Sequence, residues 1–128
     1  MAFSEQQIQD AWNRATAVEG YDNSRFRKDA CGAWIIRSKY GDTDSLYGWV
    51  IDHIVPQALL KEKGYGQEKI DIPANLRALQ HENNISKSDD YPSYTAVVTS
   101  EDSTNIKVLK FLEVNKKKQE LLKEIYNL

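Results

Sequence analysis

The stretch Trp49-Val50-Ile51-Asp52-His53-Ile54-Val55-Pro56 places one carboxylate and one imidazole side by side in an apolar run that a proline closes. A buried charge costs free energy unless it is paired or binds a metal, so this pair inside a Val/Ile-rich strand suggests a functional site. In an alternative interpretation the strand simply ends here, with Asp52 capping a turn and His53 half-buried as an ordinary ring. The residues that follow favour the functional interpretation.

The chain downstream of this stretch predicts a loop, a strand and a helix. Residues 57–72 contain Gly64 and Gly66 among several charges, which predicts a long irregular loop with one helical turn over 58–63. Long loops inside compact domains are usually functional. Residues 76–80 then predict a short strand, and residues 81–88 a short helix that ends near Asp89 and Asp90.

Upstream, the sequence predicts a helix and a hairpin. Ser4 has the form of a helix cap with Gln7 reaching back to it, and the apolar spacing predicts a helix over residues 4–15. A polar, basic connector follows over residues 25–32. Residues 33–40 and 46–51 predict two strands, which the turn residues 41–45 join into a hairpin.

The C-terminal third admits two interpretations. Residues 95–100 and 106–114 predict two strands around a turn at 101–105, followed by a helix that Asn115 caps. The competing interpretation is one long helix over residues 105–127. The lysine run 116–118 is more typical of a solvated helix face than of a nucleic-acid patch. In the closing helix, one stripe would be apolar: Leu121, Leu122, Ile125 and Tyr126.

Length and composition are those of one small globular domain, and the expected helices and strands make it an α+β fold. With 128 residues, 41% hydrophobic and 28% charged, we expect a single domain over residues 1–128. No run of about 18 apolar residues and no signal-peptide pattern occurs, so we expect no membrane contact and a cytoplasmic location. Cys31 is the only cysteine, which excludes an internal disulfide and a multi-cysteine zinc site and fits a reducing compartment.

Charge is unevenly distributed along the chain. The net charge of -2 does not indicate a nucleic-acid binder, because such domains usually carry a basic face. Residues 21–40 nevertheless carry a surplus of basic side chains, whereas residues 41–60 carry only acidic ones. A basic lip beside an acidic pocket would suit a metal-dependent phosphodiester enzyme. Chance clustering on a solvated face explains the charges equally well.

Three separated elements carry a resemblance to a known family. Asp52-His53-Ile54-Val55-Pro56, then residues 75–79 (Asn-Leu-Arg-Ala-Leu), then residues 84–87 (Asn-Ile-Ser-Lys), resemble the signature of the HNH endonucleases. The resemblance covers roughly residues 25–90. It implies a ββα-metal core, here with an N-terminal helix and a C-terminal β-hairpin and helix as extensions. It also implies one divalent metal and cleavage of phosphodiester bonds.

The resemblance assigns roles to four residues. It implies that His53 is the general base, that Asn75 orients this histidine, and that Asp52 and Asn84 are metal ligands. Hydrolysis by in-line displacement needs a deprotonated water on one side of the phosphorus and charge neutralisation at the leaving oxygen on the other. Neighbouring residues of a regular strand point to opposite faces, so Asp52 and His53 share one side only if the strand bends or bulges.

The sequence departs from the fullest family pattern in three places. Asn84 stands where many members have histidine, the paired zinc-binding cysteines of many relatives are missing, and Ser88 stands where glycine is common. An amide oxygen at Asn84 favours Mg²⁺ or Mn²⁺ over Zn²⁺, and we expect no structural zinc. His81, the other histidine, is an alternative ligand if the helix register differs. The candidate phosphate contacts are Arg27, Arg37, Arg77 and Lys87.

The sequence therefore predicts a metal-dependent HNH-type endonuclease that acts on DNA, with RNA as a further possible substrate. The alternative is a non-catalytic nucleic-acid-binding or assembly module that keeps the HNH fold. The near-neutral net charge and the lack of a separate DNA-reading segment favour that alternative, or a nuclease whose specificity comes from a protein partner.

Overall fold

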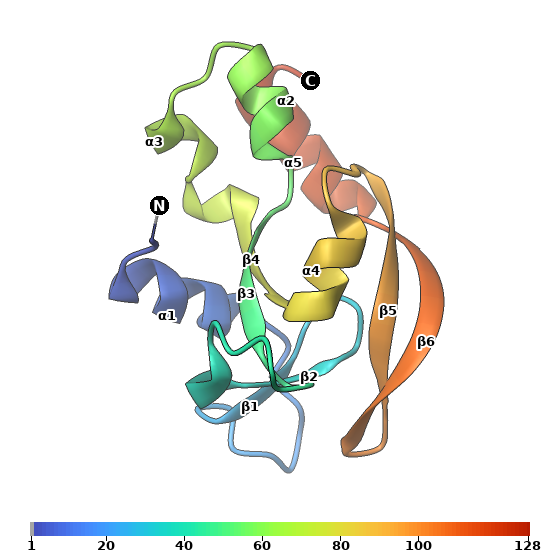
Figure 1. Ribbon diagram of the computed structural model, residues 1–128. Helices are drawn as coiled ribbons and strands as arrows, with labels where there is room; N and C mark the ends of the chain where they lie inside the picture. The colour runs from blue at the N-terminus through green and yellow to red at the C-terminus, as the bar shows by residue number, and fades with distance from the viewer. Residues whose placement is uncertain (1) are drawn as a thin grey trace.

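The strands form three separate antiparallel pairs, and the helices pack around them in a mixed α+β fold (Figure 1). The computed structural model describes residues 2–128. The α-helices are α1 (Glu5–Arg14), α2 (Gln57–Glu62), α3 (Gln67–Ile70), α4 (His81–Lys87) and α5 (Lys116–Tyr126). The strands are β1 (Phe26–Lys28), β2 (Trp34–Ile36), β3 (Trp49–His53), β4 (Leu76–Gln80), β5 (Ser93–Glu101) and β6 (Thr104–Glu113), and short 3₁₀ turns η1 (Arg37–Lys39) and η2 (Pro73–Asn75) complete the fold.

The pair of β3 and β4 lies at the centre of the molecule. The two strands run antiparallel in a regular register that sets Asp52 opposite Arg77 and His53 opposite Leu76. The predicted strand over residues 76–80 is confirmed, as is the helical turn near residues 58–63, which forms α2. The second short helix α3 was not predicted. The central strands are therefore joined by a long connection that carries its own helices.

The predicted hairpin between residues 33–40 and 46–51 is wrong. The β2 strand pairs with β1, which lies in the segment predicted to be a polar connector. Residues 37–39 form the 3₁₀ turn η1 instead of continuing the strand. The two predicted segments are linked only locally: the Ile36 amide donates to the Tyr47 carbonyl at 3.2 Å, and Trp49 Nε1 donates to the Ile36 carbonyl at 2.9 Å. Turn residues at 41–45 favour a local hairpin, but they do not show which partner completes the strand.

Helix α1 covers one face of the central pair. The capping box that the sequence predicts at Ser4 and Gln7 is present, and it satisfies two backbone donors that a helix start leaves free. The apolar stripe of α1 then packs against both central strands. The buried members of this cluster are Ile8, Ala11, Trp12, Ile35, Trp49, Ile51, Leu76 and Ala78.

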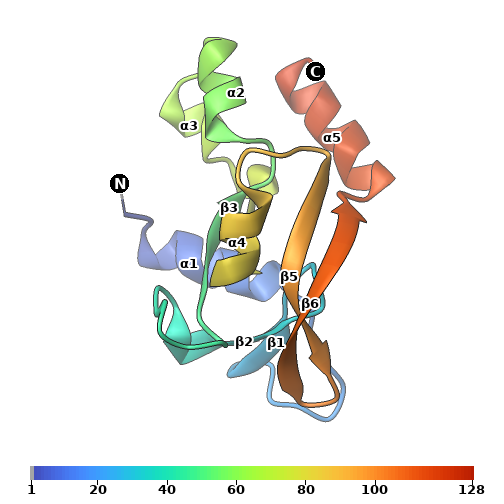
Figure 2. The same ribbon diagram turned by 45° about the vertical axis from the view of Figure 1, so that its right-hand side comes forward.

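Helix α4 follows β4 directly and lies between β3 and β5 (Figure 2). Its Asn83 side chain accepts hydrogen bonds from the backbone of Val97 and of Val98, both at 2.8 Å, so the helix docks on the edge of β5. The predicted helix over residues 81–88 is thereby confirmed to within one residue. Because α4 contacts both β3 and β5, the position of Asn84 on this helix is fixed.

The C-terminal third forms a hairpin and a helix, so the competing interpretation of one long helix is wrong. Asn115 caps α5, and its side chain accepts from the Lys118 amide at 2.8 Å. Leu122 and Tyr126 are buried in a second core cluster that also contains Cys31, whose pKa burial raises to about 12. Leu121, the outermost member of the predicted stripe, is exposed.

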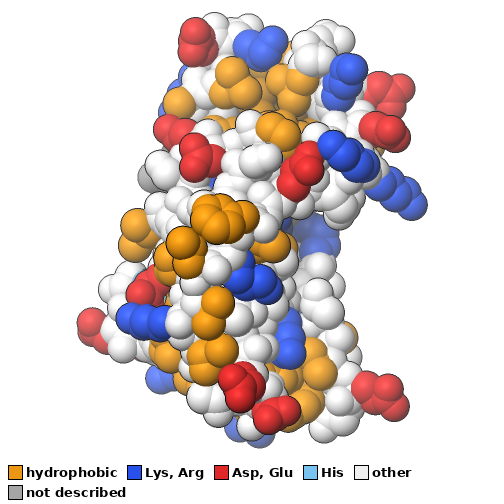
Figure 3. Space-filling view, turned by 90° about the vertical axis from the view of Figure 1, so that its right-hand side faces the viewer, with side chains coloured by type: hydrophobic (Ala, Val, Ile, Leu, Met, Phe, Trp, Pro, Cys, Tyr) orange, Lys and Arg blue, Asp and Glu red, His pale blue; other side chains and the backbone are white. Residues whose placement is uncertain are grey.

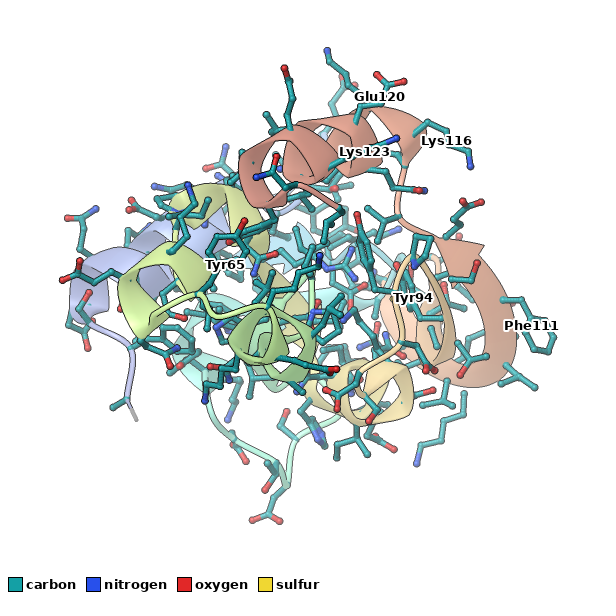
Figure 4. The ribbon with its side chains drawn as sticks, turned by 90° about the horizontal axis from the view of Figure 1, so that it is seen from above. Tyr65, Tyr94, Phe111, Lys116, Glu120 and Lys123 are labelled. Atoms are coloured by element: carbon teal, nitrogen blue, oxygen red, sulfur yellow. The ribbon has the colours of Figure 1, made fainter. Side chains whose placement is uncertain are left out.

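The two strands of the β5–β6 hairpin present different surfaces. Tyr94 on β5 lies in the interior, whereas Phe111 on β6 projects away from the body (Figure 4). Val108 and Leu109 are exposed near Phe111, and hydrophobic side chains are interspersed with charged ones on the face that carries this hairpin (Figure 3). Within residues 2–128, none of the helices has both the length and the apolar character needed to cross a bilayer.

Candidate active site

A cavity of about 320 Å³ lies beside the end of β3. It is lined by residues from five places: the segment before α1, the end of β3, the start of α2, the middle of α4, and the two residues that follow α4. The contributing residues include Ile51, Asp52, His53, Asn84, Ser88 and Asp89. The structure thus brings together three of the four residues to which the resemblance assigns chemistry.

Asp52 and His53 both line this cavity although they are neighbours in one strand. The register between β3 and β4 is regular across Asp52 and His53, so the bend or bulge considered from the sequence does not occur. Their side chains leave opposite faces of β3. The Asp52 side chain is only 4% exposed, so its contribution to the cavity surface is small.

Two buried or half-buried cations hold the carboxylate of Asp52. Arg77 Nε lies 3.0 Å from Asp52 Oδ2, and Lys87 Nζ lies 3.3 Å from Asp52 Oδ1. The same Lys87 nitrogen donates to the His53 carbonyl at 3.1 Å. Burial lowers the pKa of Lys87, and the Asp52 carboxylate opposes that shift. The two ion pairs fix Asp52 against α4 and β4.

This arrangement changes the interpretation of Arg77 and Lys87. Both are predicted from the sequence to contact the nucleic-acid backbone. The Lys87 side chain has 0% exposure, so in this arrangement it is an internal cation and does not reach a phosphate. Arg77 is 15% exposed, and its Nε atom is committed to Asp52.

His53 forms a short pair with a carboxylate that the sequence analysis does not identify. His53 Nε2 lies 2.6 Å from Asp71 Oδ1, and Gln67 Nε2 donates to the same oxygen at 2.9 Å. The Phe3 ring packs beside the imidazole, with the ring centroids 5.7 Å apart. A carboxylate on one ring nitrogen fixes the tautomer and the orientation of a histidine. Asp71 lies at the end of α3, in the long connection that the sequence marks as functional.

Asn75, which is predicted to orient His53, bonds to the backbone near it and does not contact the ring. Its side-chain oxygen accepts from the Val55 amide at 2.8 Å, and its nitrogen donates to the carbonyls of Val55 and Ile70, both at 3.1 Å. Val55 follows His53 by two residues, and Ile70 immediately precedes Asp71. One fully buried amide therefore holds both members of the His53 and Asp71 pair in place.

The cavity is lined by oxygen donors of the kind that hard divalent cations prefer. Asp52 and Asn84, the predicted ligands, both line it, and Asp89 adds a carboxylate that the sequence analysis does not assign. Each Asp52 oxygen has a second lone pair besides the one facing Arg77 or Lys87. Carboxylate and amide oxygens suit Mg²⁺ or Mn²⁺. No group of three or more His, Cys, Asp or Glu side chains that could hold a metal occurs among residues 2–128.

The remaining predicted residues lie elsewhere. Arg27 donates to three backbone carbonyls, those of Asn13, Ala15 and Asn23, and thereby ties the end of α1 to the following loop. Arg37 donates to Gln9 on α1 at 3.2 Å. His81 Nε2 lies 3.0 Å from the Ser45 carbonyl and borders a different cavity, so the structure does not bring it to Asp52.

Ser88, which ends α4 at the rim of the cavity, has a backbone conformation that favours glycine. Its φ is +50° and its ψ is -130°, and L side chains rarely adopt this region. We expect Ser88→Gly to raise the free energy of unfolding by about 1 kcal/mol, because relief of this strain exceeds the entropy that glycine adds to the unfolded chain. Urea denaturation followed by tryptophan fluorescence measures the change.

The matched control for this variant is Ser103→Gly, in the exposed β5–β6 turn. Ser103 is not among the positive-φ residues of the described chain. The same substitution there relieves no strain. It should lower the free energy of unfolding by about a few tenths of a kcal/mol, because glycine adds entropy to the unfolded chain. Equal effects at both positions would contradict the assignment of strain to Ser88.

Comparison of the chain with known protein families, with curated proteins and with solved structures finds no match.

Proposed function

We propose that this protein is a metal-dependent HNH-type endonuclease that hydrolyses phosphodiester bonds in DNA. The observation that carries the proposal is the single cavity in which Asp52 and His53 from β3 meet Asn84 from α4. These are the residues to which the resemblance assigns the base and the two metal ligands. Two antiparallel strands followed directly by a helix, in the order β3, β4 and α4, support a ββα-metal core.

His53 is the general base of the proposed reaction. When Nε2 carries the proton and donates to Asp71, Nδ1 is the unprotonated nitrogen and accepts the proton of the attacking water. The resulting imidazolium is then stabilised by the same carboxylate, as in other histidine and carboxylate pairs. Asn75 keeps both groups in register through Val55 and Ile70.

Asp52 and Asn84 are the residues that would hold the divalent cation, with Asp89 at the same cavity. When bound, Mg²⁺ or Mn²⁺ neutralises negative charge at the leaving oxygen. The ion pairs from Arg77 and Lys87 orient the Asp52 carboxylate before a cation arrives. They also compete for its charge, so weak binding of metal in the absence of substrate is expected.

Removal of metal provides the direct test. Purified protein is incubated with supercoiled plasmid and Mg²⁺, Mn²⁺ or Zn²⁺, and in parallel with EDTA. We expect nicking with Mg²⁺ or Mn²⁺ and none with EDTA, since charge neutralisation at the leaving oxygen needs the cation. Parallel reactions with single-stranded DNA and RNA identify the substrate class. Cleavage that persists in EDTA, or its absence with every metal and substrate, would contradict the proposal.

The contacts of Asp52 favour one second candidate, a non-catalytic nucleic-acid-binding or assembly module. A carboxylate already paired with two cations is electrically satisfied without a metal. Such a module would bind DNA equally well with His53 intact or replaced by alanine, and would show no cleavage. A nuclease that depends on a protein partner for specificity would still cut plasmid nonspecifically at high enzyme concentration.

A further inference from the structure

A second cavity, of about 310 Å³, lies on the other side of the central strand pair, against β4. Three cationic side chains from three separate elements line it: Arg14 at the end of α1, Arg77 in β4 and Lys118 in the first turn of α5. The proposed active site contains none of the α1 or α5 residues of this cavity. The gathered positive charge is therefore a separate feature of the fold.

Asp52 pairs with Arg77, but no ion pair within residues 2–128 involves Arg14 or Lys118. Glu113 is the one acidic residue among those that line it, and its Oε2 atom accepts from Lys116 Nζ and from Gln119 Nε2, both at 2.9 Å. Burial lowers the pKa of Lys118, and the charges of Arg14 and Arg77 lower it further. Arg14 and Arg77 thus repel the Lys118 cation, which is a cost that a bound anion would offset.

Arg77, which lines this cavity, is held in place and keeps one guanidinium nitrogen without a partner. Its Nε atom bonds to Asp52, and its guanidinium lies 5.1 Å from the centroid of the Tyr94 ring, so the group has little freedom. Tyr94 itself is buried in the interior (Figure 4). Arg77 Nη2 is buried and has no hydrogen-bond partner among residues 2–128. Buried donors without partners are rare, and a missing ligand is one established reason for them.

The start of α5 adds to the positive potential. Asn115, which caps this helix, and Lys118 both line the cavity. The first turn of α5 contains Lys116, Lys117 and Lys118 and no acidic residue. Cations are unfavourable at the positive end of a helix dipole, where anions are normally bound. The three lysines are therefore unfavourable at this helix start unless a bound anion offsets their charge.

We propose that this cavity is a binding site for a phosphate group, held by Arg14, Arg77 and Lys118. A tetrahedral oxyanion accepts donors from several directions, as these side chains provide from three elements, whereas a planar carboxylate is best matched by a single guanidinium. The phosphate could belong to a free phosphate compound or to a nucleic-acid backbone. Both share the chemistry that these cations recognise.

The test measures binding of inorganic phosphate to the whole protein by NMR chemical-shift titration at constant ionic strength, with acetate as a control anion. EDTA is present throughout, so the result does not depend on metal binding or on cleavage. We expect saturable shifts at residues around the cavity with phosphate and not with acetate. Lys118→Gln and Arg14→Gln should each weaken binding by at least about fivefold, as expected for loss of one charged contact.

Lys117→Gln is the matched control, because Lys117 is an exposed neighbour on the same helix and does not line the cavity. It should leave phosphate affinity unchanged within about twofold. A short oligothymidylate without terminal phosphates forms the second arm. Binding of the oligonucleotide alone, weakened by Lys118→Gln and not by Lys117→Gln, would identify a backbone phosphate as the source. Absence of saturable binding in both arms, or equal loss in the Lys118 and Lys117 variants, would overturn the proposal.

Discussion

His53→Ala is expected to lower metal-dependent cleavage of plasmid by about a thousandfold, within the range that general bases contribute to catalysis. The variant removes the only imidazole in the cavity that contains Asp52 and Asn84. Without it, no side chain there with a free nitrogen lone pair can take the proton from water. The initial rate of nicking at saturating Mg²⁺ or Mn²⁺ measures the loss, and DNA binding should remain nearly intact.

His81→Ala is the matched control, because it removes the other histidine of the chain. His81 borders a different cavity and contacts the Ser45 carbonyl, so its loss should leave the cleavage rate within a few fold of the original. Circular dichroism and urea denaturation of both variants separate catalytic loss from unfolding. Loss of activity in His81→Ala, with His53→Ala active and both folded, would show that the base has been assigned to the wrong residue.

Asp71→Asn tests whether the carboxylate of Asp71 assists His53 in its proposed role as the general base. An amide at this position can still accept a hydrogen bond from His53 Nε2, but it no longer stabilises the imidazolium with a negative charge. Cleavage should therefore fall by about tenfold to a hundredfold, which is less than the loss in His53→Ala. Equal rates for Asp71→Asn and the unmodified protein would show that the pair has no role in the reaction.

Local signals in the sequence predict local structure well in this chain. The capping box at Ser4, the strand over 76–80, the helix over 81–88 and the cap at Asn115 all occur as expected. Each depends on residues within a few positions of one another. The failed hairpin depends on a choice of partner instead, since β3 pairs with β4 across the intervening helices α2 and α3. Burial against α1 and α4 determines which strand pairs with β3, and no local sequence pattern predicts that burial.

The same distinction applies to the candidate site. The spacing of Asp52, His53 and Asn84 predicts that they act together, and they line one cavity. The partners of these residues could not be predicted in the same way. Asp71 reaches His53 only because α3 folds back, and Lys87 contacts Asp52 only because α4 docks beside β3. A basic residue that resembles a phosphate contact in the sequence can therefore be the internal counterion of a buried carboxylate.

Asp29→Asn is expected to lower the free energy of unfolding by about 4 kcal/mol, a value typical of breaking a buried charged network. Asp29 is 3% exposed, and its carboxylate accepts four hydrogen bonds. Oδ1 accepts from the backbone of Cys31 and Ala33, both at 2.9 Å, while Oδ2 accepts from the Gln80 amide at 2.9 Å and from Asn83 Nδ2 at 3.2 Å. One carboxylate thereby joins the segment before β2 to the junction of β4 and α4.

Asparagine has nearly the same shape, but one of its two terminal atoms is a donor. Whichever side it occupies, the amide nitrogen faces two donors, so two buried N–H groups lose their acceptor and the new N–H groups gain none. Burial raises the pKa of Asp29, and its four hydrogen bonds oppose that shift. The native carboxylate is thus held at a cost that only its complete set of donors offsets.

Chemical denaturation by urea, monitored through the three tryptophans, measures the effect. Asp90→Asn is the control, because Asp90 is exposed and its side chain makes no hydrogen bond with residues 2–128, so its change should stay within about 0.5 kcal/mol. A difference between the two variants of less than about 1 kcal/mol would contradict the assigned role. Since α4 also carries Asn84 and Lys87, a large loss at Asp29 would further imply that the proposed active site depends on a carboxylate outside its own cavity.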